Sequence, residues 1–304
     1  MQNQNKSTQN SARFLATTLH EIRTPIQTII GSAELLNTTK LDREQKEYIH
    51  QIQFSAEVLL SLANDILDYS KISDKNFKLE NTPFNIVNLV EKTTDIVSIE
   101  AFNKGLEIVT DVDTAISESI MGDQVRVQQV LLNMIKNAVK FTSKGYIYIT
   151  VKLDGDFLLF KVIDSGIGIS KEAKGNLFEA YYQADTSTTR KYGGTGLGLS
   201  ICKSLVTAMK GKLGVTDNPE TCGSVFYFTI PYKPAIDAVL KYELVIPART
   251  KILVVDDNSL ARKSLVKHLE KFGIKNIYSE SNALDALKLL REHADKGEPF
   301  STVF

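Results

Sequence analysis

The chain has 304 residues, 43% of them hydrophobic and 24% charged, which is the composition of an ordinary globular protein with more than one domain. Lys+Arg and Asp+Glu both number 36, so the zero net charge excludes a general electrostatic attraction to nucleic acid or to anionic membranes. No apolar run approaches the roughly 20 residues that span a bilayer. The two cysteines, Cys202 and Cys222, favour structural thiols over a disulfide framework or a zinc cluster. We therefore expect a cytoplasmic segment without membrane contact, any membrane anchor lying outside these residues.

The first part of the chain predicts a helical hairpin. Residues 1–11 are polar and are expected to form a flexible lead-in. Within 12–76, apolar residues recur at spacings of four and three on either side of a polar turn, which is typical of a coiled-coil seam. The seam comprises Leu15, Leu19, Ile22, Ile26, Ile29, Ala33 and Leu36, and then Tyr48, Ile52, Ser55, Leu59, Leu62, Ile66 and Tyr69. One hairpin cannot cover both stripes, so two copies are expected to form a four-helix bundle; the alternative is a monomeric hairpin packed on the rest of the chain.

Residues 77–233 mix helical and strand patterns. Segments rich in β-branched and aromatic residues predict strands, and periodic apolar segments predict helices. The predicted strands and helices are Tyr146–Leu153, Phe157–Ile163 and Ser224–Ile230, and 123–141 and 198–210. We therefore expect an α/β sandwich domain. A linker over 234–250 contains two prolines, and in a third unit, 251–304, the run Ile252–Val255 predicts a buried parallel strand.

A histidine in the first helix is a candidate phosphate acceptor. His20 comes one position after the seam residue Leu19, so it is expected at the edge of the bundle, within reach of another domain. A neutral imidazole attacks phosphorus when its other nitrogen is held by an acceptor. Glu21 is placed to orient the ring and take the proton. Taken alone, a surface His followed by Glu, as at His20 and Glu21, is far more often a solvated pair, so the other motifs decide.

Three polar residues share one face of the helix predicted over 123–141. Asn133, Asn137 and Lys140 are spaced by four and then three. An Asn amide oxygen is a neutral hard ligand for Mg²⁺, and a Lys supplies a point charge for phosphates. The pattern predicts a phosphate and metal site on this face; a plain amphipathic helix is the alternative.

Two glycine-containing segments complete the set of candidate sites. Asp164, with Gly166 and Gly168, follows a predicted strand, where its carboxylate can accept a hydrogen bond from an exocyclic amine such as that of adenine; a structural turn is the alternative. The run Gly193–Leu199 leads into a helix and offers backbone amides to phosphates. The polar stretch before it, 186–192, is expected to form a lid whose Arg190 and Lys191 reach phosphates, or else a solvated charge pair.

In this order the motifs resemble those of the histidine kinase family over roughly residues 12–232. The matching segments are His20–Pro25 with the H box, Asn133–Phe141 with the N box, Asp164–Gly168 with the first G box, Phe178–Gln183 with the F box and Gly194–Gly198 with the second G box. All five are intact; the only departure is Thr18-Leu19, where Met-Ser is common.

The resemblance implies a dimerisation and phosphotransfer hairpin followed by a GHKL-type domain that binds ATP and Mg²⁺. His20 is the implied site of autophosphorylation, and Thr24 aligns with a residue that helps position water for dephosphorylating a partner. Asn137 is the implied Mg²⁺ ligand. The implied nucleotide-binding residues are Asn133, Asn137, Lys140, Asp164, Gly166, Gly168, Phe178, Arg190, Lys191, Gly194, Thr195, Gly196, Leu197 and Gly198.

The third unit resembles the start of a flavodoxin-like receiver domain, as found in hybrid kinases. Asp256 and Asp257 follow its first strand, which suits a Mg²⁺ site in a doubly wound fold. Helices are expected over Arg262–Phe272 and Ala283–Glu292, and a third strand over Phe300–Phe304. The family's phosphoacceptor Asp would fall just past Phe304. We therefore expect a truncated receiver, and a chain that autophosphorylates without relaying phosphate to an Asp of its own.

The implied partners are a second copy of the chain, a response regulator or receiver domain, and a histidine phosphotransfer protein. Two other classes of protein share the nucleotide pocket. A GHKL ATPase that drives conformational work would lack the motif around His20. A pseudokinase scaffold would show losses at Asn137, Asp164 or the glycines, and the sequence shows none.

Overall fold

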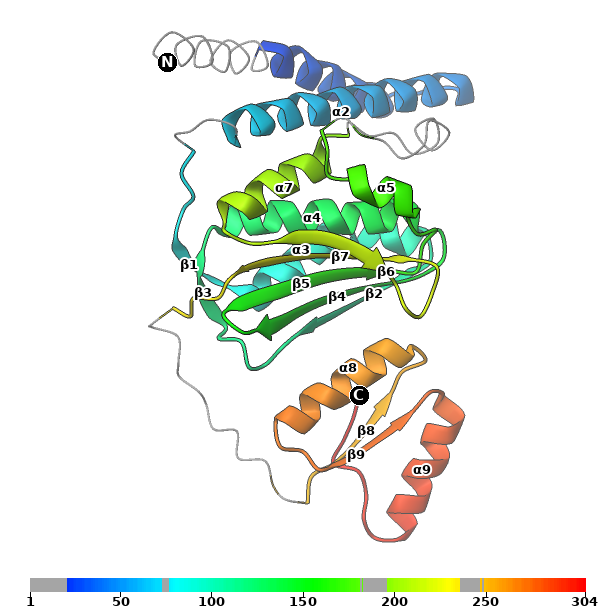
Figure 1. Cartoon of the computed structure of the whole chain (residues 1–304). Coiled ribbons are helices and arrows are strands. Elements are labelled where there is room, and N and C mark those ends of the chain that lie inside the picture. The colour runs from blue at the N-terminus through cyan, green and yellow to red at the C-terminus, as the bar shows by residue number, and fades with distance from the viewer. Residues whose placement is uncertain (1–20, 73–76, 181, 183–195, 236–246, 248) are drawn as a thin grey trace. The chain divides into compact units, whose positions relative to one another are not determined.

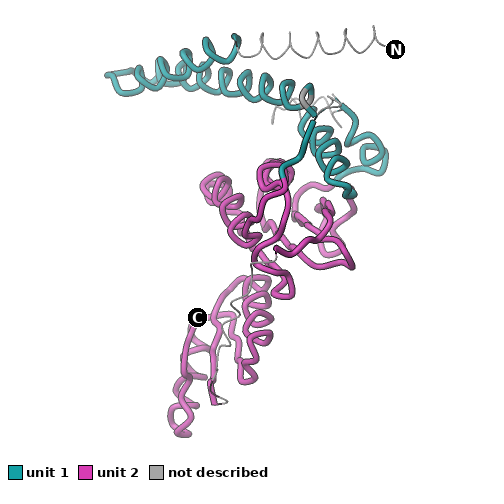
Figure 2. Tube along the Cα trace, turned by 90° about the vertical axis from the view of Figure 1, so that its left-hand side faces the viewer, with its two compact units in different colours: residues 1–80, 169–213 teal, residues 81–168, 214–304 magenta. Residues whose placement is uncertain are grey.

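The computed structural model describes residues 21–72, 77–180, 182, 196–235, 247 and 249–304. The chain divides into two compact units, which Figure 2 shows in different colours. The first unit comprises Met1–Glu80 and Ile169–Leu213, and the second comprises Asn81–Gly168 and Gly214–Phe304. Among the described residues, none of the helices combines the length and apolar character needed to cross a bilayer.

The first unit contains the predicted helical hairpin. One helix covers residues 21–37, and α2 covers Arg43–Ile72. A reciprocal cap starts α2: Gln45 N donates to Asp42 Oδ1 at 2.8 Å, and Asp42 N donates to Gln45 Oε1 at 3.1 Å. Near the other end, Arg23 donates to Asn64 Oδ1 at 2.7 Å and ties the two helices together. The turn and this contact hold the helices in an antiparallel pair.

The seam within the hairpin differs from the predicted one. The apolar residues that the hairpin buries are Ile26, Ala33, Ile49, Ala56, Ala63 and Leu67. In the first helix these are alternate members of the predicted seam, but in α2 none of the four belongs to it. In α2 the residues buried within the hairpin thus lie one position after predicted seam residues. The apolar stripe is wider than one partner helix covers, and spacing alone does not say which edge faces that partner.

The remainder of the first unit carries two further helices. The short helix α5, Lys171–Asn176, is capped by Ser170, whose Oγ accepts from Ala173 N at 3.2 Å. Helix α7, Gly198–Ala208, buries one apolar face and contacts α2. Lys203 of α7 forms a 3.0 Å ion pair with Glu179.

The second unit is built on a five-stranded sheet with the order β2-β4-β5-β7-β6. Strands β2 and β4 are parallel, and β4, β5 and β7 are antiparallel neighbours. Helices α3 and α4 lie along one face of the sheet (Figure 1), and β1 pairs with β3 in a separate two-stranded sheet. The bounds are β1 Thr82–Asn85, α3 Ile86–Asn103, β2 Leu106–Val112, β3 Ser119–Gly122, α4 Gln124–Phe141, β4 Gly145–Asp154, β5 Phe157–Asp164, β6 Leu213–Asp217 and β7 Ser224–Pro231.

Alternation along the strands explains this layer arrangement. Residues that point to the helices are fully buried, as for Ile147 and Ile149 of β4 and Leu158 and Phe160 of β5. Phe160 stacks on Phe228 of β7 with ring centroids 4.4 Å apart. The predicted strands of this domain are confirmed to within one residue at each end.

The C-terminal part of the second unit is a three-stranded parallel sheet, ordered β10-β8-β9, with two helices. Asn258 caps α8 and Asn282 caps α9. The core of this part contains Ile252, Val254 and Leu269. The elements are β8 Lys251–Val255, α8 Ser259–Lys271, β9 Asn276–Glu280, α9 Ala283–Asp295 and β10 Thr302–Val303. Both predicted helices and the third strand are found, with α8 starting three residues before its predicted first residue.

The aromatic stack in the sheet core yields a stability prediction. Phe160→Ala removes a fully buried ring and leaves a cavity, so the free energy of unfolding should fall by about 3–5 kcal/mol. Phe157→Ala, in the same strand but 38% exposed, is the matched control and should lose much less. Urea unfolding followed by circular dichroism measures both. Equal losses in the two variants would show that the stack is not a core contact.

Candidate functional site

The polar face of α4 lies beside the helix's buried stripe. Asp123 starts α4, since its Oδ1 accepts from Arg126 N at 3.1 Å, and the apolar residues of α4 are buried in the core. Asn133, Asn137 and Lys140 are each half-buried. Burial lowers the pKa of Lys140, whose Nζ lies 4.9 Å from the centre of the Phe141 ring. The predicted grouping of the three residues along one helix is present.

Asp164 ends β5 and is almost fully buried, with 4% of its surface exposed. Its Oδ1 accepts from Gly166 N at 2.9 Å and from Ser224 N at 3.1 Å. Burial raises the pKa of the Asp164 carboxyl, and these two hydrogen bonds lower it less than burial raises it. The carboxylate is thus fixed in direction by one backbone amide from the loop after β5 and one from the start of β7.

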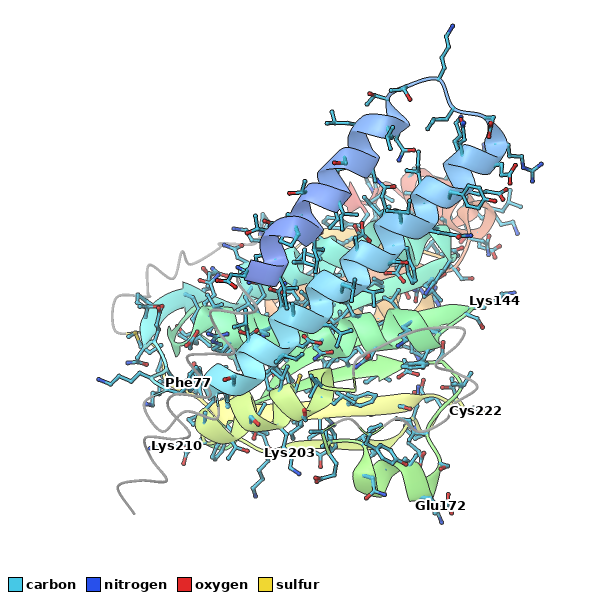
Figure 3. All side chains as sticks on the ribbon, turned by 90° about the horizontal axis from the view of Figure 1, so that it is seen from above. Phe77, Lys144, Glu172, Lys203, Lys210 and Cys222 are labelled. Carbon is cyan, nitrogen blue, oxygen red and sulfur yellow. The ribbon has the colours of Figure 1, made fainter. Side chains whose placement is uncertain are left out.

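Glycines allow three segments to meet around Asp164. A Cβ on Gly166 would lie 2.6 Å from the carbonyl oxygen of Phe141 at the end of α4. Gly168 has φ +72°, and a Cβ there would lie 2.1 Å from the carbonyl oxygen of Cys222. Figure 3 shows Cys222 and Lys144, which follows α4, at the same end of the sheet. The end of α4, the loop after β5 and the loop between β6 and β7 therefore converge.

Two residues at this junction were not assigned a role by sequence reasoning. Thr142 Oγ1 is buried without a hydrogen-bond partner among the described residues, and it would lie 3.0 Å from a Cβ on Gly166. Asn218 Nδ2 donates to the carbonyl oxygen of Asp164 at 2.8 Å. Of the two, only Thr142 could have been found from the sequence, because it directly follows the polar face of the helix. A buried, unpaired hydroxyl beside a buried carboxylate marks a place for a polar ligand.

The glycine-rich segment before α7 belongs to the first unit. Gly196 has φ +69°, Leu197 is buried, and Gly198 starts α7. The first backbone N–H groups of a helix have no intrahelical partner and can bind anions. Phe178 is half-buried. Of the other residues predicted for this segment, Arg190, Lys191, Gly194 and Thr195 lie outside the described residues.

The predicted catalytic residues are only partly described. His20 lies outside the described residues. Glu21 and Thr24 are exposed on the helix over 21–37, and the carbonyl oxygen of Thr24 accepts from Thr28 Oγ1 at 3.0 Å. Both side chains are thus on a surface that another domain can approach.

The two acids after β8 do not form a complete metal site. Asp256 Oδ1 accepts from Asn258 N at 2.7 Å, and the neighbouring Asp257 is exposed. Over the residues that the structure describes, no group of three or more His, Cys, Asp or Glu side chains is arranged to hold a metal ion. The structure thus provides two adjacent carboxylates at the carboxyl end of β8.

Comparison with known proteins places both regions in known families. Residues 10–75 match the family model of the His Kinase A (phospho-acceptor) domain. Residues 122–234 match the model described as histidine kinase-, DNA gyrase B- and HSP90-like ATPase. The sequence prediction of an ATPase domain behind a phospho-acceptor hairpin is confirmed by these matches.

Similar proteins extend over more of the chain. Hybrid signal transduction histidine kinase K of Dictyostelium discoideum is 37% identical over 93% of this chain and 25% of its own length. Autoinducer 2 sensor kinase/phosphatase LuxQ of Vibrio harveyi is 35% identical over 94% of this chain and 35% of its own length. The chain therefore spans about a quarter to a third of these two relatives. Full-length ShkA in complex with AMPPNP is structurally similar over 96% of this chain and 68% of that chain, with a TM-score of 0.73 and 29% identity.

These findings define the class of the protein. The chain carries the two domains of a histidine kinase, a phospho-acceptor domain followed by an ATPase domain, and the Asp164 junction lies within the ATPase match. Together with the histidine kinase relatives, this domain pair supports a histidine kinase enzyme.

The crowding at Gly168 yields a prediction for the site. Gly168→Ala introduces both a left-handed backbone strain and a clash with Cys222, so the free energy of unfolding should fall by roughly 1–3 kcal/mol. Gly175→Ala, which meets open space in α5, is the control and should change little. Differential scanning calorimetry compares the two. A harmless Gly168→Ala would mean that the loops do not meet as described.

Proposed function

We propose that this chain is the kinase core of a hybrid two-component signalling protein and that it transfers the γ-phosphate of ATP to His20. The observation that carries this proposal is the buried Asp164 carboxylate beside the unpaired Thr142 hydroxyl, at the end of the helix that presents Asn137 and Lys140. The match of residues 10–75 to a phospho-acceptor domain supports a histidine as acceptor.

The arrangement along α4 suits the length of a nucleoside triphosphate. The Asp164 carboxylate accepts the exocyclic amine of adenine, and the Thr142 hydroxyl offers a second polar contact to the base. At 1.5 Å per residue, Asn137 lies about 7.5 Å and Asn133 about 13.5 Å along the helix from Thr142. The base is therefore expected near the end of α4, and the phosphates along its preceding turns. ShkA was solved with AMPPNP, an ATP analogue, which favours the same ligand class for this chain.

The residues on α4 also fit a magnesium ion bound with the nucleotide. The half-buried Asn137 supplies a neutral amide oxygen, the kind of donor that Mg²⁺ accepts beside phosphate oxygens and water. Lys140 adds a positive charge close by, which stabilises phosphate oxygens. Backbone amides at Gly196–Gly198, with Thr195, Gly194, Arg190 and Lys191 before them in the sequence, are proposed to bind phosphates, and Phe178 to support this segment.

The acceptor side of the reaction rests on the first helix. We assign His20 as the nucleophile and Glu21 as the residue that orients the imidazole and takes its proton. Thr24 follows His20 by four residues in the sequence. This position suits a residue that directs water to a phosphorylated partner, and the kinase/phosphatase name of LuxQ supports that second activity.

The partners follow from exposed surfaces and from the relatives. Several large apolar side chains of the hairpin are exposed, which favours pairing with a second copy into a four-helix bundle. They are Ile22, Ile29, Leu36, Ile52 and Leu59. The structure of histidine kinase ThkA with response regulator protein TrrA supports a response regulator or receiver domain as phosphate acceptor. We interpret residues 251–304 as the start of a receiver domain with Asp256 and Asp257 as its magnesium-binding acids, and a histidine phosphotransfer protein as a further partner.

The transfer itself is tested with γ-labelled ATP and Mg²⁺. The parent chain should acquire alkali-stable, acid-labile label, and His20→Gln should acquire none. Asn137→Ala should slow labelling by on the order of 100-fold, because it removes a ligand of the metal that positions the phosphates. His50→Gln, which alters a second histidine of the hairpin at an exposed position, is the matched control and should label like the parent. Label that persists in His20→Gln would disprove the assignment of the acceptor.

The dimer is tested by placing a charge on the exposed stripe. Ile29→Glu should weaken self-association at least about tenfold in sedimentation equilibrium, because a carboxylate would be buried against a second hairpin. Ile99→Glu, at a more exposed position of α3, is the control and should leave the assembly unchanged. If both variants behave as the parent does, the stripe is not the dimer interface.

A further inference from the structure

The five-stranded sheet has a second face, which points away from α3 and α4. This face is also buried at the β2 edge. In β4, Ile147 and Ile149 point to the helices, so Thr150 points away from them. Asp111 of β2 pairs with Thr150 and shares its face. A face outside a two-layer sandwich normally meets water, yet Asp111 is 2% and Thr150 3% exposed. Another element must therefore cover this face at the β2 edge.

Helix α8 supplies the cover. Lys267 Nζ lies 2.9 Å from Asp111 Oδ2, and His268 Nε2 lies 3.5 Å from Asp111 Oδ1 and 3.2 Å from the carbonyl oxygen of Val112. Lys271 forms an ion pair with Asp113, just after β2. Two lysines and a histidine within five residues of one helix thus meet one edge strand and the residue that follows it.

The contacts continue along the whole helix. At its other end Asn258, the N-cap residue, donates to Glu107 at the start of β2. From Asn258 to Lys271 the helix rises about 20 Å. From Glu107 to Asp113 the strand extends about 20 Å as well. The partners of α8 and β2 are therefore in register from end to end, which a single chance contact would not produce.

The electrostatics of Asp111 depend on α8. Burial raises the pKa of its carboxyl, but the hydrogen bond and charge of Lys267, the hydroxyl of Tyr148 and the charge of His268 together hold it below the ordinary value. Lys271, with the backbone N–H of Ala115, lowers the pKa of Asp113 in the same way. Both basic residues that pair with these carboxylates come from α8.

We propose that the acidic face of β2, formed by Glu107, Asp111 and Asp113, is a docking surface for the basic face of α8 in the same chain. The C-terminal part is then held against the ATPase domain by this interface and not by the linker alone. While it is docked, Lys267, His268 and Lys271 are unavailable to any other partner. This inference rests on the contacts and does not depend on the proposed phosphate transfer.

The parent chain tests the proposal without any substitution. A zero-length carbodiimide joins a carboxylate to a lysine amine that touches it, so Asp113 should become linked to Lys271 and mass spectrometry should find the joined peptides. Mixing ¹⁵N-labelled with unlabelled chains tells links within one chain from links between copies. Links of a single isotope without mixed ones support the proposal; mixed-isotope links in the proportion expected for random pairing between copies, or no link between these residues, overturn it.

A matched pair of variants tests the charge complementarity. Lys267→Glu should lower the yield of the Asp113–Lys271 link by about tenfold, because it places a second carboxylate against Asp111. Lys296→Glu makes the same charge change at the exposed C-cap of α9, outside α8, and it should leave the yield unchanged. Equal yields in the two variants would show that charge complementarity does not determine the contact between α8 and the acidic face of β2.

Discussion

The buried carboxylate of Asp164 is the constraint on which the rest of the site depends. A carboxylate at 4% exposure needs hydrogen-bond donors, and here the backbone N–H groups of Gly166 and Ser224 both donate to Oδ1. Those donors belong to the loop after β5 and to the start of β7, so both segments must approach the end of β5 closely. The approach is possible because a Cβ on Gly223 would lie 1.9 Å from the carbonyl oxygen of Asp164. Glycine is therefore required where the backbones meet.

The same junction sets the end of α4 and thus the direction of its polar face. Phe141 ends the helix against Gly166, and Thr142 directs a buried hydroxyl to the same place. The helix runs back from this point over the core, held by its fully buried apolar stripe. Its polar residues therefore stand at fixed distances from the end of the helix. A site for an elongated ligand arises because a helix is rigid over this length.

Some of this arrangement was predictable from the sequence and some was not. Strands β4, β5 and β7 follow from local alternation, and the grouping of Asn133, Asn137 and Lys140 follows from helical spacing. The residues that α2 buries within the hairpin did not follow from the sequence, because periodicity reports an apolar stripe and not its partner. Thr142 and Asn218 gained their roles only from contacts with residues distant in sequence, as in the bond from Asn218 to Asp164 across 54 positions. Local patterns contain no such contacts.

The two faces of the central sheet differ in chemistry, and the difference bears on how each is used. The face under α3 and α4 is aliphatic and aromatic, so separating it from the helices would expose apolar surface at about 25 cal/mol per Å². The face under α8 presents Asp111 and Thr150 with the hydroxyl of Tyr148, all of which water solvates well. A buried ion pair contributes little net stability because both charges lose hydration. The first contact is therefore a permanent core, whereas the second can open without a large penalty, as suits a surface shared between successive partners.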